Sequence, residues 1–128
     1  MGVGDPRQIV EAVARGVDMF DCVMPTRHAR NGSAFTRDGA LAVKAGAWKQ
    51  DTRPVEEGCG CTCCRNFTRA YVRHLLNVGE ILGVRLLTLH NLHYFMTFMR
   101  ELRQAIDDGT FEAFRAGVHA RLRARVPR

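Results

Sequence analysis

Apolar and polar residues alternate in short blocks along the first part of the chain. Asp5 and Pro6 have the form of a helix N-cap and first helical residue, and apolar residues then recur at helical spacing until Gly16. Residues 1–4 have the form of a strand end, and residues 17–23 are a second apolar run. A strand, a helix of about ten residues and another strand predict a βαβ unit, which requires a parallel sheet.

The pattern changes after residue 24. Residues 25–32 begin with Pro and end with Asn-Gly, which predicts a loop. Two short extended runs, at 33–36 and 40–44, flank Arg37-Asp38-Gly39 and predict a hairpin. Residues 45–58 have no regular pattern, and we expect Trp48 to anchor them.

Helical spacing returns in the second half of the chain. A helix is expected from about residue 67 to 78, with Asn66 or Thr68 as its cap. Gly79 and Gly83 are expected to interrupt the helical pattern. A longer helix then runs from about 88 to 108, and a last one follows Thr110.

Four of the five cysteines fall between residues 59 and 64. Cys59, Cys61 and Cys64 have the spacing C-x-C-x-x-C, which aims three thiolates at one ion, and zinc takes about four such ligands. Cys63 is adjacent to Cys64, so a histidine is the better fourth ligand, and the candidates are His74, His90 and His93. Disulfides or a redox-active thiol are the alternatives.

Composition favours zinc over disulfides and suggests a type of partner. The chain has no apolar run of membrane-spanning length and no signal peptide, so we expect a cytoplasmic protein without membrane contact, where clustered cysteines usually bind metal. Its net charge is +6, and all of its 19 basic residues except Lys44 and Lys49 are arginine. Arginine suits phosphate, so a nucleic-acid partner is one interpretation and solvated surface charge is the other.

Two carboxylates interrupt the apolar run at 17–23. On a buried parallel strand, Asp18 and Asp21 would point to opposite faces, and Asp21 would lie near the carboxyl end, where α/β proteins place active sites. A buried carboxylate is costly without a partner, so Asp21 is a candidate functional residue. Arg27 and Arg30 leave the same strand end and are candidates to hold a phosphate backbone.

Taken together, these motifs resemble the bacterial type of the tRNA-guanine transglycosylase family. The resemblance runs from residue 1 to at least 111. It rests on a set of short motifs in a fixed order: Gly-Val-Gly (2–4), Asp-Met-Phe-Asp-Cys-Val-Met-Pro-Thr-Arg (18–27), Ala-Arg-Asn-Gly (29–32), Cys-x-Cys-x-x-Cys (59–64), Thr-Arg-Ala-Tyr (68–71), Glu-Ile-Leu-Gly (80–83) and Thr-x-His-Asn (88–91).

The resemblance implies a fold and an activity. The fold would be the C-terminal part of a (β/α)8 TIM barrel with an inserted zinc-binding subdomain. The activity would replace guanine at the wobble position of tRNA by a 7-deazaguanine, in queuosine biosynthesis, with Asp21 as the nucleophile that bonds to ribose. One structural zinc would be held by Cys59, Cys61, Cys64 and His90. The RNA-contacting residues would be Gly2, Val3, Gly4, Asp5, Pro6, Arg7, Gln8, Thr26, Arg27, His28, Ala29 and Arg30.

The resemblance also implies a division of the chain. Residues 1–31 would be the last βαβ unit of the barrel, 32–66 the zinc-binding subdomain, and 67–128 the helices that complete the zinc site and the barrel. The family's general acid/base aspartate has no counterpart here, so we expect a C-terminal fragment that is inactive alone. Family resemblance suggests a homodimer. The alternative function is a non-catalytic, zinc-containing RNA-binding or partner subunit.

Overall fold

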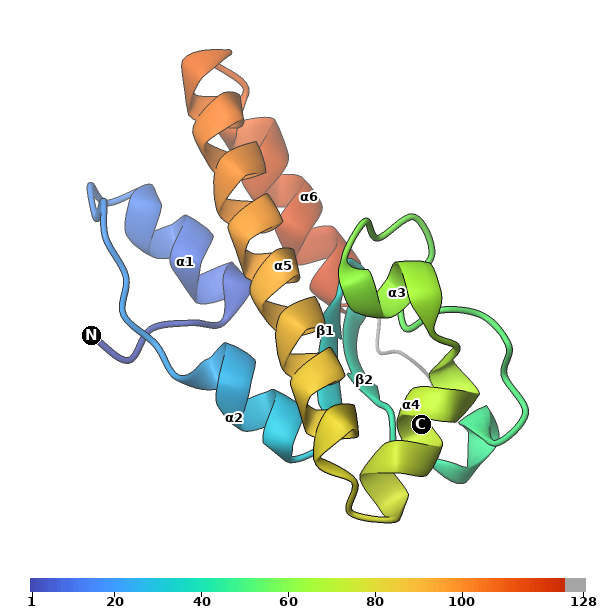
Figure 1. The fold of residues 1–128 in the computed structure, drawn as a ribbon. Helices are drawn as coiled ribbons and strands as arrows, with labels where there is room; N and C mark the ends of the chain where they lie inside the picture. Colours follow the sequence, from blue (N-terminus) through green and yellow to red (C-terminus); the bar gives the residue numbers. More distant parts are fainter. Residues whose placement is uncertain (124–128) are drawn as a thin grey trace.

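A single long helix runs the length of the molecule, and the other elements pack along its sides and behind it (Figure 1). The structure is a computed structural model that describes residues 1–123. Its elements are α1 (Pro6–Val13), α2 (Met24–Arg30), β1 (Ser33–Thr36), β2 (Gly39–Ala42), the 3-10 helix η1 (Gly46–Trp48), α3 (Thr62–Asn66), α4 (Arg69–Asn77), α5 (Ile81–Asp107) and α6 (Phe111–Arg123).

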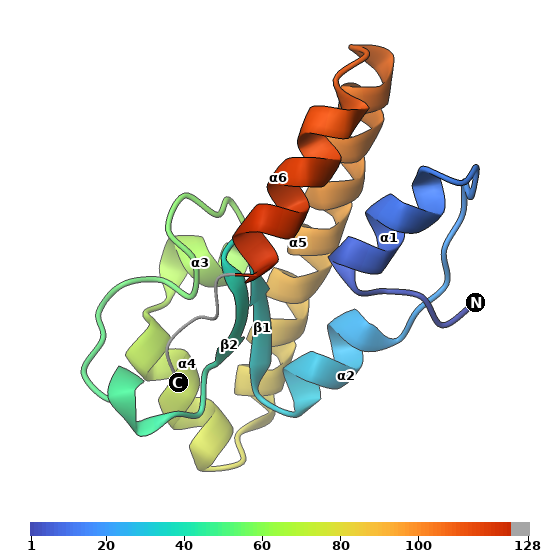
Figure 2. The same cartoon turned by 180° about the vertical axis from the view of Figure 1, so that it is seen from behind.

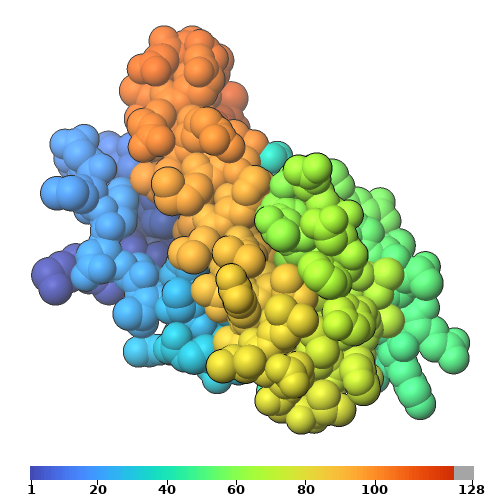
Figure 3. All heavy atoms as spheres, in the orientation of Figure 1, coloured from blue at the N-terminus to red at the C-terminus, as the bar shows by residue number. Residues whose placement is uncertain are grey.

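Two hydrophobic cores lie along α5. Around its first half, apolar side chains of α2, the hairpin, residues 55–64 (the cysteine segment) and α4 form the larger core. Around its second half, α1 and α6 close a smaller core on Phe98 and Leu102. The hairpin lies between α2 and the α3–α4 segment (Figure 2). On the face shown in Figure 3, α5 separates the N-terminal part of the chain, in blue, from the cysteine segment, in green. The cysteines and α2, which follows Asp21 in the chain, are therefore packed against the same helix.

Locally encoded elements follow the sequence prediction. The Asp5 side chain accepts a hydrogen bond from the Arg7 amide at 2.9 Å and caps α1. The Thr68 hydroxyl accepts from the Tyr71 amide at 3.2 Å and caps α4. The hairpin is antiparallel, with Ser33 opposite Ala42, as the Asp-Gly turn indicates.

The expected strands at 1–4 and 17–23 are wrong, and with them the βαβ unit. The sheet of the described residues contains β1 and β2 alone. The two N-terminal segments do lie beside each other, since the Gly2 amide donates to the Asp21 carbonyl at 2.7 Å. One backbone bond is not a ladder, and a parallel strand needs neighbours along its length.

The expected loop at 25–32 is also wrong, because residues 24–30 form α2. Pro25 occupies the first turn of α2, where its missing N–H costs nothing. The Asn-Gly pair ends the helix: Gly32 has φ +79, and its amide donates to the Ala29 carbonyl at 2.9 Å. The same residues that suggested a loop are thus the two ends of a short helix.

Gly83 does not interrupt the helical pattern. It lies inside α5, which is continuous from residue 81 rather than starting near 88. A Cβ at Gly83 would lie 2.8 Å from the Leu75 Cβ and 2.9 Å from the Leu76 backbone nitrogen. Glycine is therefore required by the close approach of α4 and α5, which the sequence pattern alone does not distinguish from a helix break.

Trp48 anchors the irregular segment, as expected. Its indole N–H donates to the Ala42 carbonyl at 3.0 Å, and the Arg69 guanidinium lies 4.7 Å over its ring. Arg69 in turn binds Asp51, whose pKa is lowered to about 2, chiefly by hydrogen bonds from Arg53. These contacts join the segment before the cysteines to α4.

None of the helices within residues 1–123 combines the length and the apolar character needed to cross a bilayer.

Candidate metal centre and the segment around Asp21

Four of the predicted site residues come together beside the first half of α5. The sulfurs of Cys59, Cys61 and Cys64 and a ring nitrogen of His90 all lie within 4.8 Å of one another. The His90 Nδ1 is 3.7, 3.6 and 3.4 Å from these three sulfurs. A tetrahedron with Zn–S bonds of about 2.3 Å and a Zn–N bond of about 2.0 Å has N···S edges of about 3.5 Å.

The local fold explains how the three sulfurs converge. Cys61 is the N-cap of α3, and its sulfur accepts a hydrogen bond from the Cys64 amide at 3.3 Å. Three residues apart on one helical turn, Cys61 and Cys64 share a face. Cys59 lies two residues before Cys61, outside α3, and its sulfur completes the set of three.

The His90 ring is held in the orientation that a metal requires. His90 is fully buried, and its Nε2 donates to the Phe35 carbonyl at 2.8 Å, because a carbonyl only accepts. In the neutral ring, the form that binds a metal, Nδ1 therefore carries the lone pair and faces the sulfurs. A backbone carbonyl on the far nitrogen is the usual way to fix a metal-binding histidine.

The electrostatics of the cluster also favour a cation. The hydrogen bond with Cys64, together with burial, raises the pKa of the Cys61 thiol to about 11, and burial raises the pKa of Cys59. Burial lowers the pKa of His90, but contacts with Cys59, Cys61 and the Phe35 carbonyl outweigh it and raise that pKa to about 10. A zinc ion supplies the positive charge that these groups attract and keeps the sulfurs as thiolates.

The remaining candidates for the metal lie elsewhere. Cys63 is fully buried in the larger core and is absent from the four-residue cluster. His74 is exposed on α4, and His93 is half-buried beside Gly60. The prediction of a single structural zinc is confirmed: the fourth ligand is His90, and four protein ligands leave no open coordination position.

Asn91 is a buried polar residue whose role the sequence analysis did not predict. It is fully buried next to His90, and its side-chain amide makes three hydrogen bonds to backbone groups outside its own helix. An asparagine on the buried stripe of a long helix was the available signal, since a buried amide needs partners.

Asp21 lies on the surface and not in a buried strand. Asp18 and Asp21 are both exposed, so the expectation of a buried carboxylate is wrong. Cys22 is half-buried, and its sulfur accepts from the Met24 amide at 3.2 Å. A Cβ at Gly4 would lie 2.2 Å from that sulfur, so residues 2–4 pass directly against the segment that carries Asp21.

The two segments predicted to contact RNA thus both adjoin Asp21: residues 2–4 lie against its segment, and α2 follows it in the chain. The side chains of Arg7, Gln8, Arg27 and Arg30 are exposed, whereas Gly4, Pro6 and Ala29 are buried. The Arg7 guanidinium binds Asp5 at 3.0 Å and lowers the pKa of that carboxyl. The ring of His28 lies 4.9 Å from that of Phe35, which leaves it half-buried.

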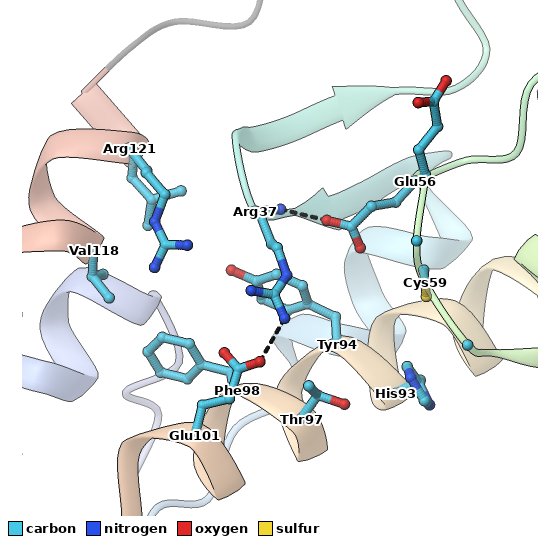
Figure 4. A pocket seen from close by; sticks show the side chains of 14 residues that line it. Arg37, Glu56, Cys59, His93, Tyr94, Thr97, Phe98, Glu101, Val118 and Arg121 are labelled. Atoms are coloured by element: carbon cyan, nitrogen blue, oxygen red, sulfur yellow. Dashed lines mark hydrogen bonds and ion pairs between the residues drawn. The ribbon is translucent and has the colours of Figure 1, made fainter. Parts of the chain in front are cut away.

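A cavity of about 230 Å³ lies beside the metal cluster, between the hairpin turn, the cysteine segment, α5 and α6 (Figure 4). Arg37 at the hairpin turn pairs with Glu101 of α5, and its amide donates to Glu56 at 2.6 Å. Burial raises the pKa of Tyr94, on the cavity wall, to about 12. The paired charges join the turn to α5 and to the cysteine segment, and sequence reasoning missed them because the partners are far apart along the chain.

The donor set and its geometry define a protein with a buried structural zinc centre. Comparison with known proteins places it more closely. The family model described as queuine tRNA-ribosyltransferase matches residues 1–124. Proteins named queuine tRNA-ribosyltransferase are 56% identical over 120 residues in Herminiimonas arsenicoxydans and 55% identical over 127 residues in Thioalkalivibrio sulfidiphilus.

These matches cover 94% and 99% of this chain and 32% and 34% of the two relatives. The chain belongs to the queuine tRNA-ribosyltransferase family. It spans about a third of the length of the curated relatives it matches and corresponds to their C-terminal part.

Proposed function

We propose that this chain carries the nucleophile and the zinc centre of an enzyme that replaces guanine at the wobble position of tRNA by a 7-deazaguanine. The observation that carries the proposal is the position of Asp21. The Gly2 amide donates a hydrogen bond to the Asp21 carbonyl at 2.7 Å, and α2 begins three residues after Asp21. The exposed carboxylate of Asp21 is therefore close to both segments predicted to contact RNA. An accessible carboxylate suits a substrate as large as tRNA.

The chemistry requires two displacements at one carbon. A carboxylate oxygen of Asp21 bonds to C1′ of the ribose while guanine leaves with the electron pair of the glycosidic bond and takes up a proton. A ring nitrogen of the incoming base then attacks C1′, loses its proton, and releases the carboxylate. Two inversions retain the configuration, as in retaining glycosidases. Zinc takes no part in these steps in this proposal.

The zinc centre supports this chemistry structurally. Cys59, Cys61, Cys64 and His90 would hold the ion and so join the cysteine segment to α5. We also propose the division of the chain into 1–31, 32–66 and 67–128, which rests on the family relationship. Residues 124–128 lie outside the described part. A (β/α)8 barrel for the complete protein is part of the proposal and rests on the family relationship.

The test joins this chain to the remaining two thirds of the Herminiimonas relative and measures exchange of labelled guanine in tRNA. Asp21→Asn is expected to reduce exchange by about 10³-fold or more, because an amide is a far weaker nucleophile. Asp18→Asn is the matched control, since Asp18 is also exposed and lies in the same segment. Full exchange by the Asp21→Asn protein would overturn the nucleophile assignment.

The 128 residues alone are proposed to bind tRNA without exchanging a base. Eight parallel strands are needed to close the proposed barrel, whereas the sheet of the described residues is one antiparallel hairpin, which the proposed division places in the zinc-binding subdomain. Base exchange by the isolated chain would contradict this part of the proposal.

A non-catalytic RNA-binding or partner subunit is the second candidate. The exposed guanidinium groups of Arg27 and Arg30 on α2 favour it, because they suit a phosphate backbone whether or not Asp21 reacts. Tight, salt-sensitive tRNA binding by the joined protein without any covalent adduct would select this function over the first.

We also propose that the protein pairs with a second copy. Large apolar side chains are exposed at the C-cap of α4 and on α5, among them Val78 at 62%, Ile81 at 79% and Met96 at 65%. Such a surface is typical of an interface. Sedimentation should show a concentration-dependent dimer, and a monomer at every concentration would contradict the proposal.

A further inference from the structure

Two neighbouring residues of α5 hold the free edge of the hairpin. In an antiparallel pair, every second residue points its backbone groups away from the partner strand. At Phe35 both outward groups are bound: its carbonyl accepts from His90 Nε2 at 2.8 Å, and its amide donates to Asn91 Oδ1 at 2.9 Å. The metal ligand and its neighbour therefore fix the same residue of β1.

The nitrogen of the Asn91 side-chain amide contacts α2. This nitrogen donates to the Ser33 carbonyl at 3.1 Å and to the Pro25 carbonyl at 2.9 Å. All three bonds go to the backbone, so they fix chain position whatever side chains the partners carry. Because Asn91 is fully buried, water is not available to replace a lost partner.

Pro25 lies in the first turn of α2, four residues after Asp21. The intervening chain is short and bound at both sides: the Met24 amide donates to the Cys22 sulfur at 3.2 Å, and the Asp21 carbonyl accepts from Gly2. A shift of α2 is therefore passed to the residue that bears the carboxylate.

We propose that Asn91 is a positioning residue that couples the zinc centre to α2 and to Asp21. Zinc at Nδ1 of His90 fixes the ring, the ring fixes Phe35, and Asn91 transfers that position to Pro25. The consequence for Asp21 rests on the function proposed above, whereas the coupling between the metal centre and α2 does not.

The first test measures hydrogen exchange of backbone amides in the 128-residue chain, together with zinc per chain. Asn91→Ala leaves all four zinc ligands in place, so zinc should stay at about one per chain. Protection of the α2 amides should fall by about tenfold or more, while protection in α1 and α6 stays unchanged.

Asn77→Ala is the matched control. Asn77 also donates from its side chain to two backbone carbonyls, those of Lys44 and Arg73, but neither belongs to α2. Exchange in α2 should be unchanged in this variant. Equal α2 protection in the parent chain and the Asn91→Ala protein, with zinc bound, would overturn the proposal.

Removal of zinc from the parent chain by a chelator decides the matter even if Asn91→Ala unfolds. The proposal requires α2 to lose protection in step with zinc and before α1 and α6 do. Retention of α2 protection after zinc has left would overturn it. Asp21→Asn should leave this coupling intact, so loss of coupling and loss of the proposed nucleophile are separate results.

A second readout tests the effect on reaction. In the protein joined to the relative's remaining two thirds, Asn91→Ala should slow formation of the covalent RNA adduct by about tenfold or more per zinc-loaded molecule at saturating tRNA, because small misplacements of a reacting group have large effects on rate. An unchanged single-turnover rate would show that Asn91 does not position Asp21.

Discussion

At the scale of single residues, the metal cluster separates cysteines that are neighbours in sequence. Cys61 and Cys64 face His90. Cys63, which lies between these two in the sequence, points into the larger core and has no exposed surface. A helical turn produces this separation, because residues three apart share a face and adjacent ones do not. The roles of the thiols thus follow from α3.

The separation of the cysteines predicts opposite results for two conservative changes. Cys61→Ser should lower bound zinc from about one per chain to near zero after dialysis, because a ligand is lost. Cys63→Ala should keep zinc and lower only the free energy of unfolding, because it removes a buried sulfur from the core. Zinc is measured by elemental analysis, and equal loss from both proteins would contradict the ligand set.

At the scale of elements, α4 and α5 approach so closely that only glycine fits between them. Gly83 is buried inside α5, against Leu75 and the backbone of Leu76. Glycine weakens a helix, so its presence there is explained by packing. The contact keeps α4 beside the part of α5 that carries His90.

Gly83→Ala should therefore destabilise the protein by about 1–3 kcal/mol, since the added methyl overpacks the contact. Gly117→Ala is the matched control: Gly117 is also inside a helix, but a Cβ there meets nothing within 4 Å. It should stabilise the protein by roughly 0.5–1 kcal/mol. Both free energies come from urea unfolding, and stabilisation by both changes would contradict the packing account.

One carboxylate of α1 adds charged contacts to its packing against α6. Glu11 accepts hydrogen bonds from Arg115 at 2.7 and 2.8 Å, from Arg15 at 2.9 Å, and lies 2.9 Å from a ring nitrogen of His119. These bonds, that of Arg115 above all, hold the pKa of Glu11 well below its ordinary value of 4.5. The smaller core is thereby closed by a charged cluster at its edge.

The lowered pKa gives the sign of the pH dependence. The stability that Glu11 contributes is fully present above pH 4.5, its ordinary pKa, and is lost as the pH falls towards the lower folded-state pKa. Glu11→Gln should remove much of this acid sensitivity in urea unfolding. Glu112→Gln is the control, because Glu112 is 77% exposed and contacts Arg115 alone in this cluster. Identical pH profiles for the parent and Glu11→Gln proteins would contradict the account.

At the scale of the whole molecule, the sequence predicted the features that depend on residues close together in the chain. The cap at Asp5, the hairpin and the three thiolate ligands follow from short motifs, because each depends on residues close together or on chemistry with few solutions. Thr68 was one of two candidate caps, and the family resemblance alone selected His90 among three histidines. The strand at 17–23 was predicted from apolar content alone, but a strand also needs partners, and the described residues supply one backbone bond.

Long-range contacts account for what sequence reasoning missed. The partners of Asn91 are 56, 58 and 66 residues away, so no local pattern indicated that it joins α5, β1 and α2. Gly83 was interpreted as a helix break because the spacing of apolar residues along the chain does not show that α4 packs against it. Both features depend on packing between elements, which is decided by the tertiary fold.

The central claim is that Asp21 bonds to the ribose, and mapping of the covalent adduct tests it most directly. The joined protein is incubated with tRNA without an incoming base, quenched in denaturant, and digested with nuclease and trypsin. The tryptic peptide 16–27 contains both Asp18 and Asp21, so fragmentation in the mass spectrometer distinguishes them. We predict a ribose phosphate without its base on Asp21, because guanine has left when the adduct forms; an adduct on Asp18 or on any other residue would contradict the account.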